Sequence, residues 1–218
     1  MVDIADGTGS KNRMKTETPL LSSGYSAVPP GKLANVETRL EMFARPPARA
    51  ATAADASLSV ERWLSPAVEE YRTLFRAVGE DWMWVSRLVM ADDQLSAILS
   101  DPLTEIYVLK DGGQPIGLLE LDFRQEGECE LVFFGLVADA IGKGAGRFLM
   151  ENAIGLAWSR PIGRFWVHTC TFDHPAAVQF YQRSGFRPYA FLVEVMDDPR
   201  LTGLMPKSAS PHVPLIEP

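Results

Sequence analysis

The chain has 218 residues, of which 46% are hydrophobic, so it can bury the core of one domain of ordinary size. A formal net charge of −7 without a basic cluster argues against nucleic acid as a main partner, and it suits a cationic substrate as well as plain solubility. The lack of a membrane-length apolar run or an apolar signal core, and the lack of a disulfide framework with only Cys129 and Cys170, predict a cytoplasmic protein without membrane contact.

The first residues have little pattern. Residues 1–33 mix Gly, Ser, Thr, Lys and Pro without periodicity, which predicts a disordered leader. From Asn35 to Met42 apolar and charged residues alternate, as in a half-buried strand. A connector rich in proline and alanine follows, and then a short strand is expected at 58–62.

The next segment predicts a helix and an aromatic turn. Ser65 and Pro66 indicate a helix start with a hydroxyl cap, and Gly79 its end. Trp82 and Trp84 follow. Rings of this kind are usually core, and the functional alternative is a wall of an acceptor site.

The middle of the chain predicts one short helix and an antiparallel meander. Asp92 caps the helix, which ends at Leu99. Turns at 111–113 and 125–127 separate the expected strands, which are 105–110, 115–123 and the apolar run that starts at Glu130.

The stretch from Glu130 to Arg160 combines a strand, a glycine loop and an amphipathic helix. The loop reads Gly142-Lys143-Gly144-Ala145-Gly146, and a helix that starts there presents free backbone N–H groups to an anion. A Cβ atom would hold a phosphate away from these donors, and Lys143 and Arg147 add positive charge. The pattern predicts a phosphate-bearing ligand. Its spacing matches neither G-x-G-x-x-G nor a Walker loop, and such a turn can also be a plain connector.

The last third predicts a crossover unit and a tail. A strand at Arg164–Cys170 follows the long helix, so it should run parallel to the Glu130 strand. Asp173, His174 and Pro175 indicate a helix start with a side-chain cap, and Gly185 the helix end. A final strand is expected at Tyr189–Met196. Residues 198–218 predict an irregular, proline-containing tail.

Two spaced motifs resemble one known family. Leu136 followed by Gly142-x-Gly144-x-Gly146 and a helix, and then Ala177-x-x-Phe180-Tyr181-x-x-x-Gly185-Phe186, are similar to the GNAT superfamily of acetyl-CoA-dependent N-acetyltransferases. The resemblance covers roughly residues 35–196. It implies an α+β (α/β) fold with a central mixed, mostly antiparallel sheet, a splayed parallel strand pair and flanking helices, in a single domain at 34–197.

The resemblance also implies an activity and a set of ligand contacts. The activity is transfer of an acetyl group from acetyl-CoA to a primary amine, a small molecule or a protein amine, in a ternary complex. The residues expected to contact acetyl-CoA are Leu136, Val137, Gly142, Lys143, Gly144, Ala145, Gly146, Arg147 and His174. Ile141 stands where the family usually has Gln or Arg, and His174 where many relatives have Asn, which puts the contact from His174 in doubt.

The resemblance implies two catalytic residues. Glu130 is the candidate general base, through a water, because a protonated alkylamine with a pKa of about 10 must lose a proton before attack. Alternatively, Glu130 is simply a glutamate at the exposed end of a strand. Glu128, two residues earlier on the same face, is the second candidate for the base. Tyr181 matches the family tyrosine that protonates the leaving thiolate, and the alternative is a half-buried helix tyrosine. Trp82 and Trp84 are the candidate substrate-binding residues.

Several points stay open. Cys129, His168, Cys170 and His174 lack the spacing of a metal site, so no metal is expected, Cys170 is interpreted as a small core residue and His168 as satisfied locally. The sequence does not determine the oligomeric state, and a homodimer is one of the states it allows. The rival function is a non-catalytic acyl-CoA-binding sensor or regulatory module on the same fold, which needs the glycine loop but not Glu130 or Tyr181.

Overall fold

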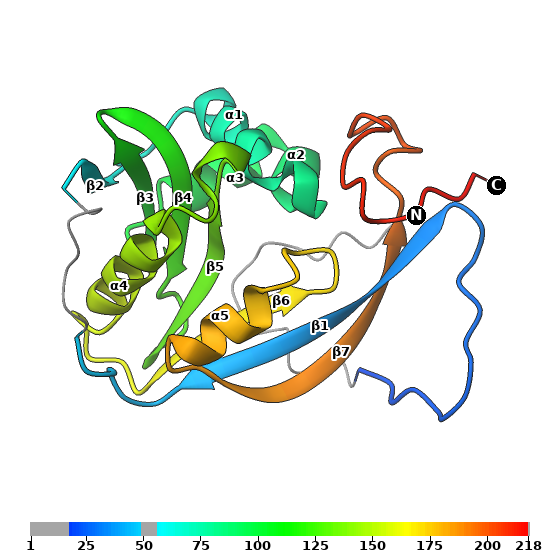
Figure 1. Ribbon diagram of the computed structural model, residues 1–218, viewed down its shortest axis with the longest axis horizontal. Helices are drawn as coiled ribbons and strands as arrows, with labels where there is room; N and C mark the ends of the chain where they lie inside the picture. Colours follow the sequence, from blue (N-terminus) through cyan, green and yellow to red (C-terminus); the bar gives the residue numbers. More distant parts are fainter. Residues whose placement is uncertain (1–17, 49–55, 218) are drawn as a thin grey trace.

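The computed structural model describes residues 18–48 and 56–217, which form one seven-stranded sheet with helices on both faces (Figure 1). The strands are β1 (Lys32–Met42), β2 (Leu58–Arg62), β3 (Thr104–Asp111), β4 (Gln114–Asp122), β5 (Glu128–Leu136), β6 (Arg164–Cys170) and β7 (Arg187–Asp197). The helices are α1 (Val68–Gly79), α2 (Ser86–Val89), α3 (Asp92–Leu99), α4 (Ala145–Ala157) and α5 (Ala177–Arg183), with 3₁₀ turns at Glu80–Trp82 and Ala138–Ala140. All the expected strands are present, and α2 is an additional helix.

The strand order is β2-β3-β4-β5-β6-β1-β7, and only β5 and β6 run parallel. This confirms the predicted mixed sheet, because the crossover through α4 returns the chain in the same direction. The position of β1 was not predicted. It lies between β6 and β7 and pairs antiparallel with both, so the first strand of the chain is an inner strand of the β6-β1-β7 part of the sheet.

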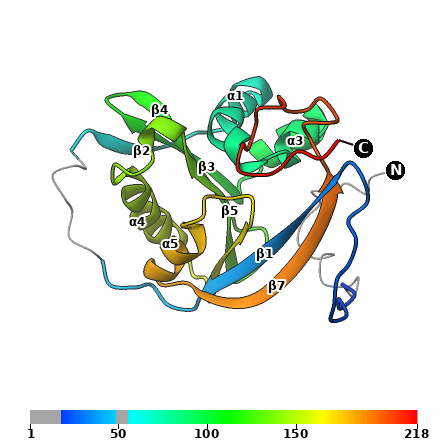
Figure 2. The same ribbon diagram turned by 45° about the vertical axis from the view of Figure 1, so that its right-hand side comes forward.

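The two faces of the sheet differ (Figure 2). On one face, α4 and α5 cover a core that includes Leu40, Leu131 and Phe165. On the other face, α1, α2 and α3 cover only the β3-β4-β5 half, with Tyr71 and Phe75 at its centre. Beyond that half, the second face carries charged residues such as Glu37 and Glu130 beside His168. At its far end, Leu33, Cys170 and Met196 pack against the apolar side chains of the C-terminal segment.

All three expected side-chain helix caps are wrong. Asp92 is the first residue of α3 rather than its cap, and Ala91 before it makes no side-chain cap. Helix α1 begins at Val68 after Ala67, with no side-chain cap, and Ser65 adopts a left-handed turn with φ 44°. Helix α5 begins at Ala177 after Ala176, again without a side-chain cap. The Asp173 carboxylate instead accepts hydrogen bonds from Thr169 Oγ1 at 2.7 Å and from Cys170 N at 2.9 Å, so it caps the end of β6.

Residues 198–217 contain no helix or strand but fold around one buried cation. The Arg200 guanidinium donates to Asp198 at 2.8 and 3.0 Å and to the carbonyls of Val213 at 2.7 Å and Pro214 at 3.2 Å. Both side chains of the ion pair are at most 2% exposed. The apolar residues of this segment, Met205, Ala209 and Val213, form a third cluster with Met83 and Phe172.

The predicted leader falls mostly outside the described residues. Of its span, 1–17 lie outside them, residues 18–31 carry no helix or strand, and Lys32 and Leu33 already belong to β1. Across the described ranges, no helix is long and apolar enough to cross a membrane.

Candidate active site

The parallel pair β5–β6 separates part-way along its length. Its register runs from Glu128 opposite Arg164 to Leu131 opposite Val167 and then stops, although β5 continues to Leu136 and β6 to Cys170. The pairing of β5 with β4 skips Val132 at the same point, so the strand carries a bulge where the gap opens. A bulge bends a strand and increases its twist, which gives a physical reason for the gap.

The glycine loop leads from β5 into α4 with its donors exposed. Gly142 and Gly144 have φ of 81° and 92°, and a Cβ atom built on either would meet nothing within 4 Å. Gly144 is the N-cap of α4 and provides no side-chain cap, and the first α-helical bond runs from Phe148 N to Gly144 O at 3.2 Å. The N–H groups of the first turn therefore have no acceptor within the helix, and open space lies in front of the loop. This is a cradle that fits a phosphate.

Two basic residues flank the cradle as the sequence predicts. Lys143 is exposed within the loop, and Arg147 is half-buried in the first turn of α4. Ala145 is buried against the main core and fixes the start of the helix. The positive charges of Lys143 and Arg147 add to the partial positive charge of the helix N-terminus.

Both backbone groups of Val137 make hydrogen bonds within the protein. Its N–H donates to Ile116 O at 2.9 Å and its C=O accepts from Ala140 N at 2.9 Å, so its N–H is not available to a ligand amide. Leu136 pairs with Gly117 on the β4 side. Since backbone groups alternate between the two sides of a strand, the Leu136 N–H faces the gap.

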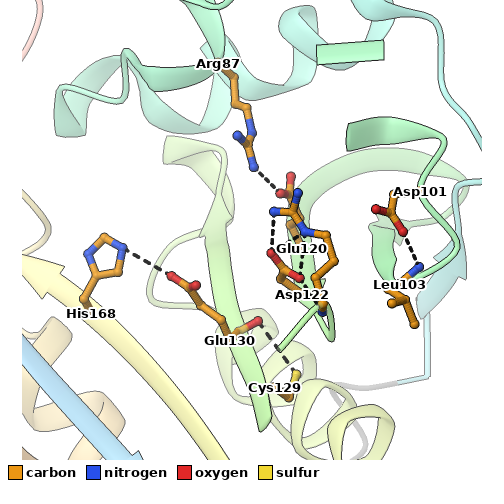
Figure 3. A network of polar contacts seen from close by, with 9 residues as sticks. Arg87, Asp101, Leu103, Glu120, Asp122, Cys129, Glu130 and His168 are labelled. Carbon is orange, nitrogen blue, oxygen red and sulfur yellow. Dashed lines mark hydrogen bonds and ion pairs between the residues drawn. The ribbon is translucent and has the colours of Figure 1, made fainter. Parts of the chain in front are cut away.

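Glu130 lies on the face that α4 and α5 leave open, one residue before the last β5–β6 pair. Its Oε1 lies 3.8 Å from His168 Nε2 on β6, and its side chain is 18% exposed (Figure 3). Glu130 and Glu128 share this face, as predicted, and they line a shallow hollow with Asp122, Gln125 and Trp166. Carboxylates thus surround the hollow, with Arg164 bound to Glu128 at 3.1 Å and Arg124 to Asp122 at 2.6 Å.

Tyr181 lies on the opposite face of the sheet. It belongs to α5 and packs against the rings of Phe134, Phe180 and Phe186. Phe134 lies in the part of β5 that no longer pairs with β6, so the Tyr181 ring lies beside the gap. Burial raises the pKa of Tyr181 well above its usual value, so the phenol stays protonated at neutral pH, as an ordinary tyrosine does.

Trp84 covers the gap from the face that carries α1. Its ring packs on Phe75 and Phe133, and its indole N–H donates to Asp173 Oδ1 at 3.3 Å. A Cβ atom on Gly135 would lie 3.0 Å from this ring and 2.4 Å from Val78. Trp84 therefore connects the α1 layer to the segment after β6, across the unpaired strand ends.

Trp82 has a different environment from Trp84. Its ring lies 5.5 Å from His174 and 5.7 Å from His212, centroid to centroid. His212 in turn contacts the Phe172 carbonyl at 3.0 Å, and His174 Nδ1 accepts from Ala176 N at 3.1 Å. The two tryptophans thus separate, with Trp84 at the gap and Trp82 between the C-terminal segment and the start of α5.

Comparisons with known proteins agree with this geometry. A model of the acetyltransferase (GNAT) family matches residues 63–186, more than half of the chain. The chain belongs to the GNAT acetyltransferase family. No curated protein matches it.

Solved structures show the same GNAT fold at low identity. A functionally unknown conserved protein from Staphylococcus epidermidis superposes with a TM-score of 0.55 at 14% identity, over 77% of this chain and 64% of its own. A GCN5-related N-acetyltransferase from Kribbella flavida gives 0.52 at 16% identity, over 79% and 63%. One from Sphaerobacter thermophilus gives 0.50 at 13%, over 78% and 53%. This GNAT chain thus spans less than two thirds of the length of each.

Sequence reasoning did not place three polar residues that lie near the gap between β5 and β6. Asp173 was expected to cap a helix. His168 was considered only as a metal ligand or a locally satisfied side chain, although its place two residues after Trp166 puts both on one face of β6. Glu37 contacts His168 only because β1 lies next to β6, and no local pattern reveals that pairing.

Within residues 18–48 and 56–217, no group of three or more His, Cys, Asp or Glu side chains is arranged to hold a metal ion. Of the two cysteines, Cys129 is fully buried, and Cys170 is half-buried and packs against the third apolar cluster. Burial raises the pKa of both thiols, that of Cys170 to about 12.

Proposed function

We propose that this protein transfers an acetyl group from acetyl-CoA to the primary amine of a cationic acceptor, directly within a ternary complex. One observation carries the proposal: the gap between β5 and β6 has Glu130 near its start on one face of the sheet and Tyr181 on the other. A thioester carbonyl held in such a gap is reachable from both faces.

The glycine cradle is the proposed binding site of the CoA pyrophosphate. Gly142 and Gly144 leave the space that a phosphate needs, and the N–H groups at the start of α4 supply donors. Lys143 and Arg147 supply positive charge beside it. The unpaired edge of β5, with the Leu136 N–H, offers hydrogen bonds to the amides of the pantetheine arm, in the way that an added strand completes a sheet edge.

The two faces then divide the proton chemistry. Glu130 accepts a proton from the ammonium, directly or through a water, so that the neutral amine can attack the carbonyl. The C–N bond forms and the C–S bond breaks. Tyr181, protonated at neutral pH as a phenol ordinarily is, donates to the departing sulfur. Positioning by the gap and these two groups are the catalytic contributions that we assign to the chain.

The acceptor approaches from the face of Glu130. The hollow there is lined by Asp122, Glu128 and Glu130 beside the Trp166 ring. Arg124 and Arg164 balance the charges of Asp122 and Glu128, so the attraction for a cationic acceptor that we propose rests on Glu130. Trp84 bounds the gap further along the same face. The net charge of −7 adds a general attraction for a positively charged acceptor.

Release of free CoA thiol in the presence of acetyl-CoA and a panel of primary amines tests the proposal. We expect amine-dependent release that is fastest with acceptors carrying a second positive charge. CoA binding without any amine-dependent release would identify the rival function, an acyl-CoA-binding module. If the protein neither binds CoA nor releases its thiol, both functions are overturned.

A further inference from the structure

Acetylation of an ammonium ion requires a route for a proton to leave the site. The balanced reaction converts R–NH3⁺ and acetyl-CoA to the amide, CoA–SH and one H⁺. Two protons therefore leave the nitrogen, and only one of them is matched by the proton that the sulfur gains. Glu130 is only 18% exposed, so a proton taken up there needs a path to water.

His168 occupies the position of such a path. It is the first residue of β6 after the last pair with β5, so it lies at the point where the gap opens. Its Nε2 lies 3.8 Å from Glu130 Oε1, and its Nδ1 lies 3.5 Å from Glu37 Oε2 on β1. Three neighbouring strands thus align a carboxylate, an imidazole and a second carboxylate. Both separations are ion-pair distances, and contacts between catalytic groups commonly shorten to hydrogen bonds when substrate binds.

The surroundings of His168 suit proton transfer. Its side chain is 32% exposed, more than either carboxylate, so the imidazole has access to water. The charged groups around it are Glu130 from β5 and, from β1, Glu37 together with Arg39, which donates to Glu37 at 2.6 Å. Tyr189 of β7 lies behind Arg39. Arg39 holds the Glu37 carboxylate in place, and the two carboxylates favour the imidazolium that forms during transfer.

We propose that His168 is a positioning and proton-relay residue for Glu130, with Glu37 fixing the imidazole. A proton that moves from the amine to Glu130 passes to Nε2, while the proton on Nδ1 leaves toward Glu37 and the solvent. The proposal rests on the acetyl-transfer function and adds a residue to it. His168 acts through Glu130 and touches neither the thioester nor the amine.

The substitution His168→Gln tests the relay, because glutamine can replace a hydrogen bond but cannot pass a proton. We expect kcat at pH 7 to fall about 10- to 100-fold with an alkylamine acceptor, which is smaller than the roughly 100- to 10,000-fold of a direct general base because His168 acts through Glu130. KM for acetyl-CoA should stay unchanged. The loss should shrink as the pH approaches about 10, where the alkylamine deprotonates in solution. It should also disappear with an aromatic amine that is already neutral at pH 7. A purely structural role would lower kcat equally at every pH and for both amines.

Glu37→Gln and Glu41→Gln form a matched pair if the histidine variant folds poorly. Both glutamates are on β1 and face the same side, but Glu41 binds Arg164 at 2.8 Å and lies opposite Trp166 in the strand pairing. We expect the pH-dependent loss in Glu37→Gln and wild-type kinetics in Glu41→Gln. If His168→Gln turns over as fast as the wild type, or if it loses the same factor in kcat with both amines, the relay alone is overturned. No turnover by the wild type with any amine overturns the transfer function and the relay with it.

Discussion

Gly144→Ala should separate ligand binding from backbone strain. Gly144 has φ 92° and open space in front of it, at the start of α4. Gly113, in the β3–β4 hairpin, has φ 88° and equally open space, but it lies far along the chain from the cradle. The left-handed conformation costs an alanine about 1 to 2 kcal/mol at either position. Both variants should therefore melt roughly 2 to 8 °C below the wild type.

Only Gly144→Ala should lose CoA affinity. The added methyl group lies where we place the pyrophosphate, so at least one backbone hydrogen bond to a charged oxygen is lost. Such a bond contributes about 1.5 to 3 kcal/mol, which corresponds to roughly 10- to 150-fold in Kd. Isothermal titration calorimetry with CoA measures the difference, with Gly113→Ala as the control. Equal CoA affinity in the two variants would refute the placement of the pyrophosphate.

Three further predictions concern other parts of the molecule. Tyr181→Phe should lower kcat about 100-fold or more at unchanged CoA affinity, and stopped-flow thiol release with wild-type turnover would contradict its role as the acid. Arg200→Met leaves the Asp198 carboxylate buried without its partner and should cost about 3 to 5 kcal/mol of unfolding free energy at pH 7. The hydrogen bond from Arg200 lowers the pKa of Asp198, so the stabilisation by this ion pair is present above the unfolded pKa of about 3.9 and is lost as pH falls through the folded pKa. Denaturation of the wild type and of Arg200→Met should therefore give unfolding free energies whose difference shrinks below about pH 4. A difference that does not change with pH would contradict this. Because burial raises the pKa of Cys170 to about 12, the native thiols should react with Ellman's reagent at pH 8 far more slowly than in the unfolded chain, and rapid labelling would show the opposite.

Local patterns were sufficient to predict most elements of the fold. Strand β6 follows from the alternation between Arg164 and Cys170, and the cradle follows from the glycines between β5 and α4. The three side-chain caps were mispredicted because a short polar side chain has several donors within reach. Asp173, for example, binds Thr169 Oγ1 and Cys170 N at the end of β6 instead.

The parts that could not be predicted depend on long-range pairing. The bulge at Val132 leaves no clear mark in an apolar run, yet it coincides with the start of the gap and shifts the alternation, so that Glu130 and Phe133 share a face. The insertion of β1 between β6 and β7 brings Glu37 to His168 across more than a hundred residues. Neither feature follows from propensity or periodicity, because both are set by which strands pair.

A crystal structure of the protein with bound CoA is the most direct test of the central claim. It should show the pyrophosphate on the N–H groups of Gly142 to Gly146 and the thiol sulfur in the gap between β5 and β6, with Glu130 on one side of the sheet and Tyr181 on the other. A sulfur atom outside that gap, or a pyrophosphate away from the start of α4, would contradict it.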